Sequence, residues 1–133
     1  MRPIYKKAII MSAERFDASM GQNSIATDEL RAALASSNYS FKEVLGMYKG
    51  VSETSFFVEY NNGGALADLN SLASFYDQES ILHLDEDRNA SLVYCDSDEE
   101  TKVGLFQAID KSEAFKLDAY TYCPQLNMYF AVK

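Results

Sequence analysis

The chain has 133 residues, of which 47% are hydrophobic, and its formal net charge at pH 7 is −8. This length suits one domain with an ordinary core, and the apolar content is too high for a disordered chain. The acidic balance disfavours nucleic acid, whose phosphates require a basic face, and no apolar run approaches the roughly 18 residues of a membrane-spanning helix. We therefore expect one domain over residues 1–133, in the cytoplasm, without a membrane or nucleic-acid partner.

The first two predicted elements are a strand and a helix. Residues 4–11 form a short apolar run with β-branched members, which is typical of a strand. From Ile25 the apolar residues follow a helical period, and Asn23 or Ser24 could cap the helix. The polar segment 36–38 ends it. The stretch between strand and helix reads as a loop that could close over a ligand.

A β-hairpin follows. Residues 39–48 and 52–60 predict two strands joined by a turn at Lys49 and Gly50. The second strand has the clearest alternation in the chain: Thr54, Phe56, Val58 and Tyr60 face one side, and Ser55, Phe57 and Glu59 face the other.

The second half predicts one more helix and several strands. Residues 66–76 carry apolar side chains at helical spacing, and residues 79–84 and 90–95 predict strands on either side of an acidic turn. Residues 103–109 and 126–132 predict further short strands or a partly irregular C-terminal extension.

The order βαββαβ predicts an α+β, ferredoxin-like fold with additional C-terminal strands. Right-handed crossovers would place both helices on one face of an antiparallel sheet. The other face would then be exposed, with aromatic side chains such as Phe56 or Phe57. An exposed aromatic face predicts self-association.

The common catalytic motifs are absent from the sequence, which has no Walker loop, GxGxxG, HExxH or GxSxG pattern. Cys95 and Cys123 lack neighbours at metal-ligand spacing and predict reduced thiols. His83 alternates with Ile81 on a predicted strand, so a structural role is favoured over a catalytic one. We expect no metal and no cofactor.

A polar cluster remains at the hairpin and at the end of the second helix, formed by Gly46, Tyr48, Glu53 and Gln78. Each has an ordinary interpretation as well. Tyr48 suits an amphipathic rim, Glu53 a solvated strand start, and Gln78 a helix terminator.

Several segments resemble the phage S-adenosylmethionine lyases, formerly called hydrolases. The similarity runs roughly from Ala8 to Tyr94 and includes a helix end, a Gln, a strand, a turn and a Leu-Val-Tyr run. The connection from Tyr48 to Glu53 is shorter than in those lyases. The segments that carry the resemblance are Ile10–Arg15, Leu30–Leu34, Gly46–Tyr48, Glu53–Phe56, Phe75–Leu82 and Asn89–Tyr94.

The resemblance implies a ferredoxin-like trimer with sites between subunits, in the host cell cytoplasm if the chain is phage-encoded. It also implies cleavage of S-adenosylmethionine to methylthioadenosine and homoserine lactone, or homoserine, as an anti-restriction activity. On this interpretation Glu53 lies near the sulfonium or ammonium and Tyr48 orients the substrate. Gln78, Ser12 and Asn23 would contact the substrate.

Two other functions stay open from the residues. A module with this fold could sequester a small ligand or bind a host protein through its aromatic sheet face without catalysis. An acidic chain could also mimic nucleic acid and block a host enzyme. Detection of methylthioadenosine would separate the enzyme from the non-catalytic module.

Overall fold

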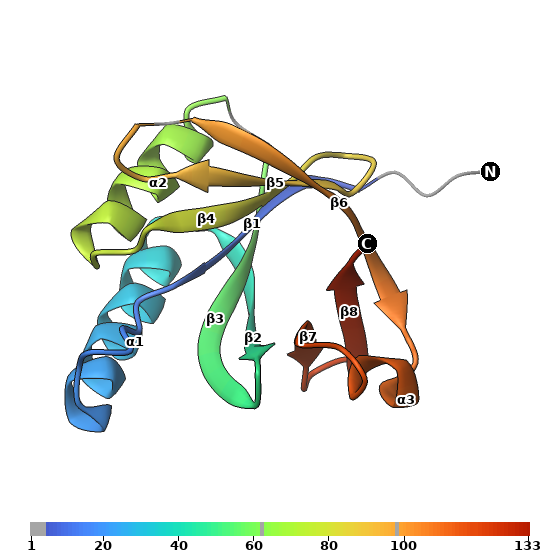
Figure 1. Ribbon diagram of the computed structural model, residues 1–133. Helices are drawn as coiled ribbons and strands as arrows, with labels where there is room; N and C mark the ends of the chain where they lie inside the picture. The colour runs from blue at the N-terminus through green and yellow to red at the C-terminus, as the bar shows by residue number, and fades with distance from the viewer. Residues whose placement is uncertain (1–4, 62, 98) are drawn as a thin grey trace.

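The computed structural model describes residues 5–61, 63–97 and 99–133 (Figure 1). Within these ranges the chain forms eight strands and three helices. The strands are β1 (Lys7–Ser12), β2 (Ser40–Tyr48), β3 (Val51–Tyr60), β4 (Ser80–Leu84), β5 (Asn89–Tyr94), β6 (Glu100–Ile109), β7 (Ala119–Cys123) and β8 (Met128–Val132), and the helices are α1 (Met20–Ser36), α2 (Ala65–Phe75) and α3 (Lys111–Ala114).

The strands close into an antiparallel barrel with the order β1-β3-β2-β7-β8-β6-β5-β4, in which β4 pairs back with β1. The predicted order of the first six elements, βαββαβ, is present. The ferredoxin-like α+β fold class is nevertheless wrong, because the later strands are part of the same sheet. β5 extends it from β4, β6 pairs with both β5 and β8, and β7 joins β2. In the part of the chain that the structure describes, every strand therefore pairs with two neighbours, as in a closed barrel.

The expectation of an exposed aromatic sheet face is also wrong. Phe56 is fully buried on the helix side of the sheet. Phe57 points to the barrel interior, where its ring lies 6.4 Å from that of Phe106, and Phe106 stacks at 5.1 Å on Phe130. Since strands β5–β8 enclose this face, it provides no argument for self-association.

The main core lies between the barrel wall and helices α1 and α2, which cover the same side of the sheet in Figure 1. Apolar residues of alternate strand positions meet the inward stripe of each helix. Each large side chain that is fully buried here stabilises the fold by about 1.5–3 kcal/mol. The central members are Ile9, Phe56, Val58, Leu30, Leu34, Leu69 and Ile81.

Helix α1 begins earlier than the sequence predicted. Its N-cap is Ser19, whose hydroxyl accepts the Gln22 N–H while the Gln22 side chain accepts the Ser19 N–H. This reciprocal capping box satisfies two of the free donors at the helix start. The predicted caps, Asn23 and Ser24, therefore lie inside the helix.

The elements that the sequence analysis missed are α3 and β7, and β6 begins before its predicted start. β6 pairs with β5 through its first half and with β8 through its second half, with a register shift near Gly104. The φ of Gly104 is 138°, and an added Cβ would lie 2.6 Å from the Lys133 carbonyl oxygen. Only glycine fits this close approach, which closes the barrel.

The sequence predicted reduced thiols at Cys95 and Cys123 and favoured a structural role for His83. Cys123 is buried and Cys95 is partly buried. The Nε2 of His83 lies 2.7 Å from the Tyr60 hydroxyl. In the described part of the chain, every helix is too short or too polar to cross a membrane.

Candidate functional site

The β2–β3 hairpin turns two of the predicted site residues toward the barrel interior. Gly46 pairs with Glu53 and Tyr48 pairs with Val51, and paired residues share one face of an antiparallel sheet. Lys49 and Gly50 have φ values of 49° and 82°. Two positive φ values are typical of the tight two-residue turn that matches strand twist. The turn thus fixes Tyr48 and Glu53 on the same inner wall.

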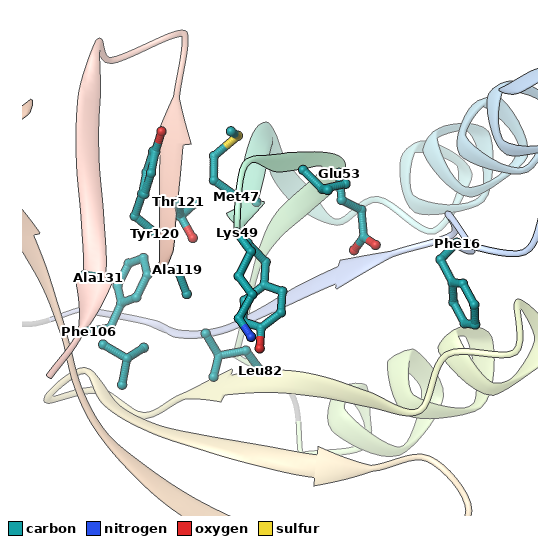
Figure 2. Close-up of a pocket in the computed structure, with 14 residues that line it drawn as sticks. Phe16, Met47, Lys49, Glu53, Leu82, Phe106, Ala119, Tyr120, Thr121 and Ala131 are labelled. Carbon is teal, nitrogen blue, oxygen red and sulfur yellow. The ribbon is translucent and has the colours of Figure 1, made fainter. Parts of the chain in front are cut away.

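This wall borders a cavity of about 580 Å³, a volume typical of small-molecule sites. Gly46 leaves space beside Glu53, because a Cβ there would meet nothing closer than 3.7 Å. Strands β7 and β8 form the facing wall in Figure 2. The lining is mainly apolar and includes Phe16, Met47, Tyr48, Lys49, Val51, Glu53, Leu82, Phe106, Ala119, Tyr120, Thr121, Ala131 and Val132.

Glu53 is the carboxyl group of the cavity. Its side chain reaches solvent through the cavity, yet the concave wall surrounds it with protein atoms. This burial is the main cause that raises the pKa of Glu53, and the nearby charge of Glu14 raises it further. The polar Ser12 hydroxyl beside the carboxyl opposes both effects and lowers the pKa. A cation in the cavity would favour the ionised form.

Ser12 lies beside Glu53. Its Oγ donates its one proton to the Thr54 carbonyl oxygen at 2.8 Å, and its position beside the Glu53 carboxyl lowers the pKa of that group. The same Oγ accepts the Glu14 N–H at 3.0 Å. Ser12 therefore joins the end of β1 to β3 directly next to the carboxyl group.

Tyr48 stands at the rim of the cavity with 60% of its surface exposed. The Nζ of Lys49 lies 5.3 Å from the centroid of its ring. The phenol can therefore approach a bound molecule from the rim without leaving the hairpin.

Gln78 and Asn23 do not line the cavity and instead hold the β1–α1 loop (residues 13–19). The Nε2 of Gln78 donates to the Glu14 carbonyl oxygen at 2.9 Å. Asn23 accepts the Arg15 N–H at 2.9 Å and donates to the Arg15 carbonyl at 3.0 Å. Both amide groups are thus used by the backbone of a loop that borders the site.

Two residues of this loop were missed as site candidates. The Glu14 carboxylate accepts the N–H of Thr54, the residue after Glu53, so it connects the loop to β3. Phe16 lines the cavity. A signal was present in the sequence, because Glu14 and Phe16 closely follow the strand that carries Ser12. Their proximity to Glu53 depends on the pairing of β1 with β3.

The arrangement suits a small cationic molecule. Glu53 supplies a negative charge at the wall of a mainly apolar, open cavity, where protein atoms on one side reduce the screening by water. In the described ranges, no group of three His, Cys, Asp or Glu side chains is placed to hold a metal ion. The fold and this cavity define a β-barrel protein with a carboxylate-bearing site for a small molecule.

Comparison with known protein families then identifies the family of this chain. The model of the S-adenosylmethionine lyase family matches residues 9–133, nearly the whole chain. The chain therefore belongs to the S-adenosylmethionine lyase family and is an enzyme that acts on S-adenosylmethionine, a sulfonium cation. No curated protein matches it.

Proposed function

We propose that the cavity binds S-adenosylmethionine and cleaves it to methylthioadenosine and homoserine lactone. The observation that carries this proposal is the Glu53 carboxyl, held on the inner wall of an apolar cavity of small-molecule size. A carboxylate there attracts a sulfonium ion and favours substrate over its uncharged thioether product. Product release would follow from the loss of that charge.

The chemical step needs no nucleophilic side chain. The substrate's own carboxylate oxygen attacks its γ-carbon, the carbon–sulfur bond breaks, and the electron pair stays on sulfur. The sulfonium becomes a neutral thioether, the amino acid closes to a lactone, and no proton is transferred. Positioning can lower the barrier of such an intramolecular displacement by about 7–11 kcal/mol relative to a bimolecular reaction.

Each predicted site residue has a proposed task. Glu53 attracts the cationic part of the substrate, and the Tyr48 hydroxyl orients it from the rim. Ser12 lies beside the Glu53 carboxyl, lowers its pKa and ties the end of β1 to β3 through the Thr54 carbonyl oxygen. The contacts of Gln78 and Asn23 support a task in placing the β1–α1 loop, so that these residues act on the substrate through the loop.

A hydrolytic route is the alternative within the same cavity. Here Glu53 would take a proton from a water molecule that attacks the γ-carbon, and the product would be homoserine. Its raised pKa makes the carboxylate a better base at neutral pH than an ordinary glutamate.

Product analysis tests the proposal. Purified protein is incubated with S-adenosylmethionine in H₂¹⁸O, and the products are separated and weighed by mass spectrometry. We expect methylthioadenosine and unlabelled lactone, whose slow hydrolysis places ¹⁸O in the carboxyl group. Label in the γ-hydroxyl of homoserine would establish the hydrolytic route. Substrate that binds but stays intact would refute cleavage.

We further propose a trimer with the site between subunits, and an anti-restriction role in phage infection through depletion of the methyl donor. Val51, at the cavity rim, is 70% exposed and would be covered by a second copy. Sedimentation that shows only monomer would refute the trimer. Expression in a host with a restriction system that uses S-adenosylmethionine should protect incoming phage DNA, and unchanged restriction would refute the role.

A further inference from the structure

Phe16 is an apolar side chain in an unusual place. It is fully exposed, although it lines the same cavity as Glu53. A phenylalanine ring offers a large apolar surface, and leaving that surface in water forgoes the gain of its burial. Single exposed apolar side chains are common, but this ring lies at the edge of the cavity, where a bound molecule could cover it.

The loop that carries Phe16 is held in place before any ligand binds. Glu14 is fixed by the Gln78 amide and by the Thr54 N–H, on the two sides of the loop. The Arg15 backbone is held by Asn23, and its guanidinium bonds Asp77 at 2.9 Å. Because Phe16 directly follows these residues, its backbone needs little further ordering when the ring takes up a contact.

The charged residues of the cavity indicate which part of the substrate each end would hold. Among the described residues that line it, Lys49 alone is cationic, and Thr121 adds a hydroxyl on the β7 side. These groups suit the carboxylate of an amino acid. Glu53 lies between Lys49 and Phe16 in Figure 2 and suits the sulfonium. The Phe16 end then remains for the uncharged purine.

We propose that Phe16 is the stacking platform for the adenine ring of the substrate. This inference rests on the proposed function, since it assumes an adenosyl sulfonium substrate in this cavity. Stacking of a base on an aromatic side chain tolerates any large π-face. Tyr and Trp should therefore replace Phe16, whereas Ala should not.

The experiment measures binding of 5′-methylthioadenosine by calorimetry, and turnover of S-adenosylmethionine, for the wild type and for Phe16→Ala and Phe16→Trp. We expect Phe16→Ala to weaken binding and to raise KM by roughly 5- to 150-fold, with kcat nearly unchanged, because stacking is kept from ground state to transition state. Phe16→Trp should restore both values. Phe75→Ala is the matched control, since Phe75 is also largely exposed but does not line this cavity.

Three results would overturn the inference. They are wild-type binding by Phe16→Ala, absence of methylthioadenosine binding by the wild type, and dissociation of an oligomer by Phe16→Ala but not by Phe75→Ala, which would make Phe16 a subunit contact. Different results would refute the proposed function. Phe16-dependent binding without cleavage would refute catalysis and support the platform, whereas cleavage that does not depend on Phe16 would do the reverse.

Discussion

The two faces of strand β3 have opposite characters. The outer face buries Phe56 and Val58 completely against the helices. The inner face carries Val51 and Glu53, which remain open to a cavity. Neighbouring residues of a strand point to opposite faces, so stability and chemistry alternate along the same ten residues. A substitution on one face should therefore affect folding, and on the other face function.

Phe56→Ala tests the outer face and should have the largest effect. The side chain is fully buried and contacts the Phe41 ring edge to face at 5.7 Å. Loss of this ring should lower the free energy of unfolding by about 3–5 kcal/mol. Urea unfolding measures the change. The comparison variant is Phe57→Ala, one residue along, which should lose less because Phe57 is only partly buried. Equal losses would contradict the contrast between the faces.

Glu53→Gln tests the inner face. It keeps the shape of the side chain and removes its charge, so turnover should fall by about 10²–10³-fold, as expected for loss of one electrostatic group. Chromatography of methylthioadenosine measures the rate. An unchanged rate would remove Glu53 from the site.

The same variant should be more stable than the wild type at neutral pH. The raised pKa means that folding disfavours the ionised carboxyl, so the stability of the wild type falls as pH rises from the ordinary glutamate pKa through the folded pKa. The glutamine side chain of the variant does not ionise. Thermal unfolding should show a higher midpoint for Glu53→Gln at pH 8 and no difference at pH 4. A lower midpoint at pH 8 would contradict the burial of the charge.

Glu14→Gln should have the smallest effect. It tests whether the carboxyl groups of Glu14 and Glu53 interact electrostatically. The charge of Glu14 raises the pKa of Glu53, and glutamine removes that charge while it can still accept the Thr54 N–H. The acidic limb of kcat/KM against pH should therefore move to lower pH, with the plateau unchanged. Glu14→Ala, which also loses the acceptor, should lower the plateau as well. A limb that does not move would show that the carboxyl groups are uncoupled.

Several local features of the fold were predictable because they depend on near neighbours in the chain. The alternation of residues 52–60, the turn at Lys49 and Gly50, and the helix at 66–76 follow from side-chain period and turn chemistry. The start of α1 was missed because the Ser19–Gln22 capping box was not recognised. β7 was missed although its five residues, Ala119–Cys123, alternate tyrosines with smaller side chains, a strand pattern that was not recognised.

The candidate site also has some features that could be predicted from near neighbours in the chain and others that could not. The hairpin register alone sets Tyr48 and Glu53 on one face, so that pair could be predicted. The tasks of Gln78 and Asn23 could not, because their partners, Glu14 and Arg15, are separated from them in sequence and meet them only in the folded chain. Phe16 likewise becomes a site candidate only when the cavity is known.

The sequence by itself determined the element order βαββαβ and the two-faced character of β3, because both arise from side-chain spacing within short segments. It also carried the resemblance that the family match over residues 9–133 confirmed. Only the tertiary structure decided that the sheet closes through β5–β8 and that the inner face becomes a cavity. Closure depends on pairings such as β2 with β7, whose residues are far apart in the chain and leave no local periodic signal.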